Sequence, residues 1–252
     1  MGRLDNKAAI ITGGAGSIGK ATADLFLKEG ASVLVVDKNE EALTMAMKEI
    51  DSPKLIRCIA DVTDVNDVKR FVKEATRQFG NVDIFFNNAG IVGVIKPIQD
   101  YPEDVFDEVL AVNVKGVWLG AKHVLPVMNN GGSMIISSSV SGLKGAMNLS
   151  GYITSKHAVI GIMRAMAVEF APKNIRVNSI HPAPVDSPMM RFIENQFSPD
   201  GTAQARKERE KRIPFGRYAT SEEVAKLVVW LGCDESKFIT GTTQIIDGGL
   251  IG

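Results

Sequence analysis

Seven short apolar runs alternate with amphipathic stretches along this chain of 252 residues, and this alternation limits the folds that the chain can adopt. Each run has the length of a strand that is buried on both faces of a parallel sheet. The runs lie at residues 8–12, 32–37, 55–59, 82–86, 133–136, 175–180 and 243–246. We therefore predict an α/β fold, in which about seven parallel strands form one doubly wound sheet with helices on both faces.

The stretches between the runs support this assignment and favour one undivided domain. Residues 18–29 and 64–78 have helical apolar spacing, and Gly30 and Gly80 follow them as C-terminal stops. Hydrophobic residues make up 45% of the chain, which is enough for a sizeable core, and no Pro/Gly/Ser-rich linker divides it. We predict a single domain over residues 1–252.

The charge balance indicates which partners to expect. Twenty-nine basic and 29 acidic side chains cancel, so the chain lacks the positive field that nucleic acid or an anionic membrane requires. Every apolar stretch is shorter than the roughly 20 residues of a membrane span, and charged residues interrupt the start before any signal-peptide core. We expect a cytoplasmic protein whose partners are small molecules and copies of itself.

Cysteine and histidine usage also narrows the chemistry. Cys58 falls in a strand pattern and Cys233 in a helix pattern, without Cys-x-x-Cys spacing, which favours reduced, buried thiols. His123, His157 and His181 do not have the spacing of metal ligands. We therefore expect no catalytic metal.

Polar residues stand at or just after the ends of six of the seven runs. They are the glycine-rich turn 12–19, Asp37, Asp61, Asn87-Asn88-Ala89-Gly90, Ser139 and His181-Pro182. The carboxyl ends of parallel strands meet at one edge of a sheet, and open α/β sheets bind their ligands at that edge. The sequence therefore predicts one ligand site there.

Tyr152 and Lys156 have the spacing of an acid/base pair on one helix face. Positions four apart share a face, so the Lys156 ammonium can lie beneath the Tyr152 phenol and favour its anion. The phenol then becomes a usable base closer to neutral pH. The Ser139 hydroxyl, if it lies beside that phenol, can hold the oxygen of an alcohol or ketone. The alternative is a half-buried tyrosine over a lysine whose side chain extends to solvent.

Together these motifs resemble the short-chain dehydrogenase/reductase family, in its compact type with Tyr-x-x-x-Lys, over nearly all of the chain. The resemblance implies a Rossmann-like fold and hydride transfer between NAD(H) and a secondary alcohol or ketone. It assigns catalysis to Asn113, Ser139, Tyr152 and Lys156. Tyr152 would be the acid/base, Ser139 would orient the substrate oxygen, and Lys156 would lower the tyrosine pKa and hold the nicotinamide ribose. Asn113 would anchor a water that links Lys156 to solvent.

The resemblance also implies the cofactor contacts. The turn Gly14-x-Gly16-x-x-Gly19 follows a predicted strand and opens a helix, whose amino end can bind a pyrophosphate. The implied contacts are Gly13, Ser17, Ile18, Gly19, Asp37, Asp61, Val62, Asn88, Gly90, Tyr152, Lys156, Pro182, Val185 and Ser187. Three residues depart from the family pattern: Ser17 and Ala183 stand where glycine is usual, and Ser187 stands where threonine is usual.

Asp37 bears on the choice between NAD and NADP. It lies eighteen residues beyond Gly19, near the spacing at which a carboxylate accepts from the adenosine ribose hydroxyls, and it would repel a 2′-phosphate. Lys38 could attract that phosphate, but position 16 is glycine, where family members that use NADP often carry a basic residue. We expect NAD, with NADP as the less favoured cofactor.

Several of these residues have purely structural alternatives. Asp37 could be the N-cap of a helix over 39–50, and Asp61 could cap the next helix. Ser139 belongs to a run of three serines that could satisfy the backbone at a strand end, and Asn113 could cap or kink a helix. The asparagines that follow the fourth run could form an ordinary turn.

The expected substrate walls are the segments 91–96, 143–149 and 187–214. The third contains an insertion at about 188–214 that has the composition of an apolar lid, or alternatively of an ordinary amphipathic helix. Its apolar residues are Met189, Met190, Phe192, Ile193 and Phe197. The charged run 206–212 is more typical of a solvated helix face than of a ligand site. We expect a small, mostly uncharged substrate.

A predicted helix over 158–168 bears on assembly. Arg164 is its only charge, and its apolar residues spread around the helix. One apolar face would pack on the sheet, and a second, to which we assign Met163, would need another subunit as cover. Members of the family are usually tetramers or dimers, so the resemblance implies a homo-oligomer, a tetramer before a dimer.

Two other functions fit the same motifs. A 3-oxoacyl-thioester reductase would more often require NADPH and a basic face for an acyl carrier, and Asp37 and the zero net charge count against it. A non-catalytic dinucleotide-binding protein would share the fold, but intact Tyr152, Lys156 and Ser139 count against that reading. The sequence favours the alcohol or ketone oxidoreductase.

Overall fold

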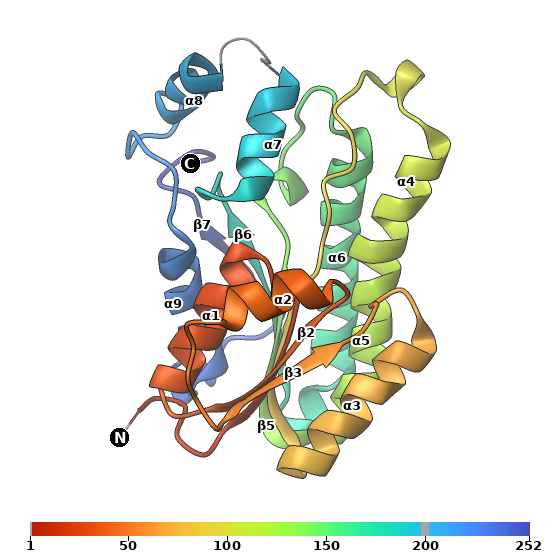
Figure 1. The fold of residues 1–252 in the computed structure, drawn as a ribbon, viewed down its shortest axis with the longest axis vertical. Coiled ribbons are helices and arrows are strands. Elements are labelled where there is room, and N and C mark those ends of the chain that lie inside the picture. Colours follow the sequence, from red (N-terminus) through yellow and green to blue (C-terminus); the bar gives the residue numbers. More distant parts are fainter. Residues whose placement is uncertain (1, 198–201) are drawn as a thin grey trace.

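The computed structural model describes residues 2–197 and 202–252, and these form a seven-stranded sheet with helices around it (Figure 1). The strand order is β3-β2-β1-β4-β5-β6-β7, and every neighbouring pair is parallel. The strands are β1 (Ala8–Thr12), β2 (Ser32–Asp37), β3 (Leu55–Ile59), β4 (Val82–Asn87), β5 (Met128–Ser137), β6 (Arg176–Pro182) and β7 (Thr243–Ile246). The predicted doubly wound, Rossmann-like sheet is confirmed.

Helices cover both faces of this sheet and bury a hydrophobic core on each. One core packs against α3 (Val65–Phe79), α5 (Val117–Val124) and α6 (Ser150–Glu169). The other packs against α1 (Ser17–Lys28), α2 (Glu40–Met47) and α9 (Ser221–Gly232). Because both faces exclude water, the strands need continuous apolar runs rather than alternating ones, which is the pattern that the sequence carries.

Local signals set the helix ends. α3 begins after Asp64, whose side chain accepts from the N–H groups of Asn66 and Asp67, and it ends at Gly80 with φ of 81°. That left-handed conformation suits glycine because it has no Cβ. α9 begins with a capping box, in which Thr220 and Glu223 each bond the other's backbone N–H.

Some boundaries differ from the expectation. β5 begins at Met128 rather than 133, because the Asn-Asn-Gly-Gly stretch that follows Met128 has low strand propensity and conceals the start. β6 continues through His181 and Pro182, which therefore lie in the strand instead of after it. Cys233 lies just beyond the end of α9, and both it and Cys58 are buried and free.

The middle of the chain contains a widened helical turn. α4 (Glu103–Leu110) continues into α5 through six residues of π-helix, Ala111–Gly116. Such turns are rare and frequently occur at functional sites. Asn113 lies in this turn and is fully buried.

The assignment of Met163 to an outward face of α6 is wrong. Met163 is fully buried in the core between α6 and the sheet. The outward positions are Gly161, Ala165 and Val168, which are exposed. The sequence did not distinguish the two faces because apolar residues occur all around this helix.

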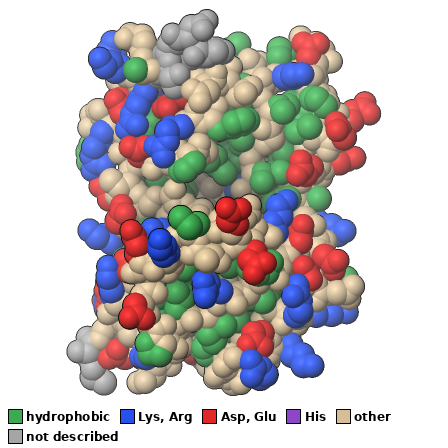
Figure 2. All heavy atoms as spheres, in the orientation of Figure 1, with side chains coloured by type: hydrophobic (Ala, Val, Ile, Leu, Met, Phe, Trp, Pro, Cys, Tyr) green, Lys and Arg blue, Asp and Glu red, His purple; other side chains and the backbone are tan. Residues whose placement is uncertain are grey.

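Two further helices, α7 (Pro188–Phe197) and α8 (Thr202–Glu210), lie near the carboxyl ends of β6 and β7 (Figure 1). They belong to the expected insertion at about 188–214, of which residues 198–201 lie outside the described residues. The space-filling view shows basic and acidic side chains interspersed over this side of the molecule (Figure 2). In the described part of the chain, no helix is both long and apolar enough to cross a membrane.

Candidate active site

A cavity of about 1170 Å³ lies at the carboxyl edge of the sheet. Its volume slightly exceeds that of ordinary small-molecule pockets and suits a ligand as large as a dinucleotide together with a small molecule. Fourteen of the predicted site residues line it: Gly13, Ser17, Ile18, Asp37, Asp61, Val62, Asn88, Gly90, Ser139, Tyr152, Lys156, Pro182, Val185 and Ser187. Gly19 and Asn113 are not among the lining residues.

The glycine-rich turn is packed too tightly for side chains at two positions. Gly13 has φ of 68°, and a Cβ there would lie 2.9 Å from the Ala89 Cα. A Cβ on Gly19 would lie 2.2 Å from the Gly13 carbonyl oxygen. α1 then begins at Ser17 without a side-chain cap, so its first N–H groups and its positive dipole end are available to an anion in the cavity.

Asp37 and Asp61 are not the caps of the following helices. Asp37 accepts the N–H of Ala15 at 3.0 Å and that of Asn39 at 3.2 Å, while Asn39 is the N-cap of α2. Asp61 accepts the N–H and the hydroxyl of Thr63, each at 2.8 Å, and the cap of α3 comes later in the chain. Both capping alternatives are therefore wrong. The Asp37 carboxylate is fixed against the glycine-rich turn at the cavity wall.

Hydrogen bonds join the end of β1 to the segment that follows β4, at the cavity wall. The Thr12 hydroxyl accepts from the N–H groups of Asn88 at 3.0 Å and Ala89 at 3.1 Å. The Asn88 side chain donates to the Thr12 carbonyl at 3.0 Å. These are long-range bonds rather than those of a local turn, and they fix the segment after β4 beside the glycine-rich turn.

Tyr152 and Lys156 lie in the first turns of α6 at the cavity wall. The Lys156 ammonium lies 5.5 Å from the centre of the Tyr152 ring and donates to the Ser137 carbonyl at 2.9 Å. Lys156 is buried, and burial lowers its pKa to about 8. A snorkelling lysine, with its ammonium in water, is therefore not what the structure shows.

The pKa of Tyr152 differs from the expectation. Burial raises it above its ordinary value, and a hydrogen bond with Ser139 opposes this rise. The predicted lowering by Lys156 is not seen in this structure, because burial of the phenol dominates. The sequence could show that the two side chains share a helix face, but it could not show that burial outweighs the effect of Lys156 on the phenol.

Ser139 is held by one hydrogen bond to its hydroxyl and one to its backbone carbonyl. Its hydroxyl accepts the N–H of Ser141 at 3.1 Å, and its carbonyl accepts from Nδ1 of His181 at 2.8 Å. Nε2 of His181 lies 2.8 Å from the Ser179 hydroxyl. A carbonyl can only accept, so Nδ1 carries the proton, and the neutral ring accepts at Nε2 from Ser179. Burial lowers the His181 pKa, which favours this neutral form.

His181 is a residue whose role the sequence did not reveal. Its position at the end of the sixth run was noted, but its contact with Ser139 crosses 42 residues of chain. The available signal was a polar, buried residue at the carboxyl end of a strand that neighbours the serine strand. The pairing of β5 with β6 supplies the contact.

Asn113 supports the site from behind. Its side chain accepts the N–H of Ile91 and donates to the Ile91 carbonyl, each at 2.8 Å. It also donates to the Ser155 hydroxyl at 2.9 Å. A Cβ on Gly90 would lie 3.2 Å from the Asn113 Oδ1 and 3.4 Å from the Lys156 Nζ. The amide thus fixes the loop after β4 in the neighbourhood of Lys156.

The opposite side of the cavity is formed by α7 and α8. Met189, Met190, Ile193 and Phe197 line it, whereas Phe192 is 41% exposed and lies outside the lining. Lys144, Gly145, Ala146, Met147 and Leu149 line it from the segment 143–149, and Ile91 lines it from 91–96.

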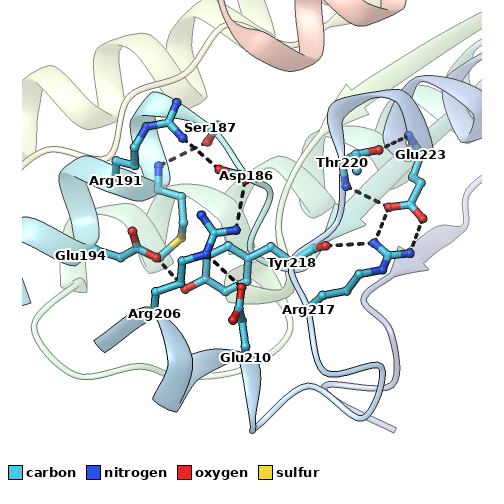
Figure 3. A network of polar contacts seen from close by, with 11 residues as sticks. Asp186, Ser187, Arg191, Glu194, Arg206, Glu210, Arg217, Tyr218, Thr220 and Glu223 are labelled. Atoms are coloured by element: carbon cyan, nitrogen blue, oxygen red, sulfur yellow. Dashed lines mark hydrogen bonds and ion pairs between the residues drawn. The ribbon is translucent and has the colours of Figure 1, made fainter. Parts of the chain in front are cut away.

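The charged run 206–212 was expected to be a solvated helix face, but part of it faces the cavity. Glu208, Arg209 and Arg212 line the cavity, so a wholly solvated face is wrong for these three residues. The reason is that α8 carries charges on both faces, and its packing turns one of them inward. Arg206, in contrast, is paired with Asp186 at 3.0 Å and with Glu210 at 2.9 Å (Figure 3).

Comparison with known proteins agrees with this geometry. A family model described as enoyl-(acyl carrier protein) reductase matches residues 13–251. Levodione reductase of Leifsonia aquatica is 35% identical over 98% of this chain and 95% of its own. The chain belongs to the short-chain dehydrogenase/reductase family.

Other members of this short-chain dehydrogenase/reductase family are equally similar. The 3-oxoacyl-[acyl-carrier-protein] reductase of Thermotoga maritima is 37% identical over 99% of both chains. A crystal structure of levodione reductase superposes with a TM-score of 0.94 at 34% identity and covers 98% of each chain. That of NAD⁺-bound xylitol dehydrogenase gives a TM-score of 0.93 at 34% identity, covering 98% of this chain and 99% of its own.

Membership of the short-chain dehydrogenase/reductase family makes a nicotinamide dinucleotide the group to test against the residues present. The turn at Gly13 and Gly19 leaves room for backbone alone, the amino end of α1 is uncapped, and Asp37 stands at the end of the neighbouring strand. A pyrophosphate needs N–H donors, and ribose hydroxyls need an acceptor. The residues therefore fit such a cofactor. Among the described residues, no group of three or more His, Cys, Asp or Glu side chains is arranged to hold a metal ion.

Proposed function

We propose that this chain is an NAD-dependent oxidoreductase that interconverts a secondary alcohol and a ketone. The observation that carries the proposal is that Ser139, Tyr152 and Lys156 line the same cavity as the glycine-rich turn and Asp37. An acid/base group is useful for hydride transfer only when it lies within reach of both substrate and cofactor. One continuous cavity meets that condition.

Each residue has a task in this proposal. The amino end of α1 and the turn at Gly13 hold the pyrophosphate, Asp37 accepts from the adenosine ribose hydroxyls, and Lys156 donates to the nicotinamide ribose. Bound NAD supplies the acceptor or donor of the hydride. The remaining cofactor contacts come from other residues that line the cavity. In this proposal Asp61 and Val62 contact the adenine, and Pro182, Val185 and Ser187 contact the nicotinamide.

The proton chemistry belongs to Tyr152 and Ser139. The Ser139 hydroxyl holds the substrate oxygen, and the Tyr152 phenol gives a proton to that oxygen in ketone reduction or takes it in alcohol oxidation. Since burial raises the pKa of Tyr152, the phenol is protonated at neutral pH and is ready to act as the acid. Asn113 keeps the loop after β4 in place beside Lys156, and the water relay remains a prediction.

The thioester reductase remains the second candidate, because the matched family model and the Thermotoga maritima relative are both described as acyl-carrier-protein reductases. The fixed carboxylate of Asp37 favours NAD and so favours the first candidate. We also propose that α7 and α8 act as a substrate lid and that exposed Gly161, Ala165 and Val168 of α6 meet another subunit in a homo-oligomer. Light scattering at micromolar concentration tests the assembly.

An absorbance assay at the reduced-nicotinamide band tests the function. Each cofactor is combined with a panel of secondary alcohols, polyols, cyclic diols, their ketones and a 3-oxoacyl thioester. Turnover of an alcohol or ketone with NAD(H) supports the first candidate. Turnover of the thioester alone, with NADPH, would replace it with the second, and dinucleotide binding without any turnover would indicate a non-catalytic protein.

A further inference from the structure

The side of the cavity formed by α7, α8 and the segment 143–149, which we call the substrate side, carries basic side chains that form no ion pair with any acidic residue that the structure describes. Lys144, Arg209 and Arg212 line it, and Glu208 is the acid beside them. Glu208 is in direct ion contact with Lys211 at 2.8 Å, while Arg212 acts on it only through its charge. In the described part of the chain, Lys144 and Arg212 have no ion-pair partner of their own. The cations on this wall therefore exceed the anions.

Arg209 is the most informative of these cations. Its guanidinium lies 4.7 Å from the centre of the Phe197 ring and also contacts the Tyr218 hydroxyl. Its Nη1 is buried and has no hydrogen-bond partner. A buried donor of a permanently charged group is unfavourable without an acceptor. The side chain is thus held in place, and Nη1, which the surrounding protein encloses, makes no hydrogen bond with any described residue.

Arg206, on the same helix, has two carboxylate partners. Arg206 donates to Asp186 and Glu210 and lies 4.9 Å from the centre of the Tyr218 ring (Figure 3). Tyr218 in turn donates to the buried Glu194 at 2.8 Å. The acids near α8 are therefore engaged by Arg206, Lys211 and Tyr218, and none of them forms an ion pair with Arg209.

We propose that the substrate carries a carboxylate that binds Arg209, with Arg212 and Lys144 adding favourable charge around it. A planar guanidinium matches a carboxylate because two N–H groups can donate to its two oxygens. Met189, Met190 and Ile193 line the same side and suit a short apolar carbon chain. The substrate class is then a short hydroxy acid or oxo acid, in place of the uncharged molecule expected from the sequence. This inference rests on the proposed function, since the oxygen at Tyr152 must belong to the same molecule.

Matched substrate pairs test it. We would measure kcat/KM with NAD for hydroxy acids of about four to six carbons, with the hydroxyl at different positions, and for the methyl ester of each. We expect the best acid to exceed its ester by at least about tenfold. The preference should decrease with added salt, because the contact is between charges.

Variants of α8 assign the preference to one residue. Arg209→Met should remove the advantage of the acid over its ester, and Arg209→Lys should restore part of it. Lys207→Met is the matched control, since Lys207 is an exposed cation on the same helix that does not line the cavity. Its acid/ester ratio should stay at the wild-type value. Melting temperature and NAD affinity are measured for each variant to show that it is folded.

The outcomes separate this inference from the proposed function. Equal turnover of acids and esters, or a ratio unchanged in Arg209→Met, would overturn the carboxylate site and leave the function standing. If no alcohol or ketone is turned over, the proposed function is wrong. The carboxylate site can still be tested by calorimetry, which compares the binding of short carboxylates and of the matching amides to the protein in the presence of NAD. Carboxylate binding that is lost in Arg209→Met supports it, and equal binding of carboxylates and amides contradicts it.

Discussion

The two ends of the cavity are held together by different interactions. At the cofactor end, part-buried hydrogen bonds, each between a side chain and a backbone group, join Thr12 of β1 to the segment after the neighbouring strand β4. At the substrate end, ion pairs between side chains join α8 to the loop after β6, as between Arg206 and Asp186. Those side chains are half-exposed, whereas Thr12 is buried.

This difference separates the part of the site that the sheet topology determines from the part that can vary between chains of the same fold. The parallel sheet brings the carboxyl ends of its strands to one edge, so its topology places the glycine-rich turn, Asp37 and Ser139 of this chain together. Side chains on α7 and α8 can be exchanged without changing the sheet. The cofactor end therefore identifies the family, and we expect the end formed by α7 and α8 to determine what this member acts on.

The largest expected effect is at the point where the two ends meet. Tyr152→Phe removes the transferable proton with little change in volume, so kcat should fall by about 10²- to 10⁴-fold while NAD affinity stays near the wild-type value. Steady-state kinetics and a cofactor titration measure the two quantities. Tyr101→Phe, which removes a hydroxyl that does not line the cavity, is the control. Near-normal turnover in Tyr152→Phe would remove the acid/base assignment.

A smaller change is expected from the charge at the cofactor end. We expect wild type to prefer NAD over NADP by at least about tenfold in kcat/KM, which is about 1.4 kcal/mol. Asp37→Asn keeps an oxygen acceptor for the Ala15 N–H but removes the charge, so the preference should narrow. Measuring both cofactors in both proteins checks this. A ratio that does not move would show that Asp37 has only its structural role.

A substitution of Lys156 tests whether its buried ammonium lowers the free energy of unfolding. Burial lowers its pKa to about 8 from an ordinary 10.5, so below about pH 8 the folded protein retains a buried ammonium that the unfolded chain holds at no cost. Lys156→Met removes this cost but also the bond to the Ser137 carbonyl. We expect the variant to be inactive and about 1–2 kcal/mol more stable at pH 7.

The pH dependence supplies the check. Between about pH 8 and the ordinary value, the unfolded state binds more protons than the folded one, so the stability of wild type rises with pH. The advantage of Lys156→Met should therefore be smaller at pH 9 than at pH 7 in urea unfolding. A variant less stable than wild type at both values would show that the lysine is well accommodated in its buried site.

Much of the cofactor end could be predicted from sequence because its signals are local. The apolar runs locate the strands, and each polar residue at a strand end is then placed by the parallel topology. The features that were missed depend on contacts between distant residues. They include the bond of His181 to Ser139, the burial that sets the direction of the Tyr152 pKa, and the π-turn around Asn113.

The substrate end was predicted less well for a related reason. Residues 206–212 read as a solvated helix because charges occupy all of its faces, and only the packing of α8 shows that Arg209 and Arg212 face the cavity. Met163 was placed on the wrong face of α6 because that helix is apolar all around. A helix without a clear polar side gives no orientation from its own sequence.

The smallest expected effect separates the two ends directly. Arg206→Met breaks the ion pairs with Asp186 and Glu210, but these groups are partly exposed, so the loss of stability should stay within about 0.2–1 kcal/mol. Asn88→Ala leaves the Thr12 carbonyl without its side-chain donor and should cost about 1–3 kcal/mol. Urea unfolding compares the two variants. We expect Arg206→Met to raise KM for the substrate with little effect on NAD affinity, and Asn88→Ala to weaken NAD binding. If Arg206→Met instead destabilised the fold as much as Asn88→Ala, the α8 ion pairs would belong to the framework of the fold, and the distinction between a fixed cofactor end and an exchangeable substrate end would not hold.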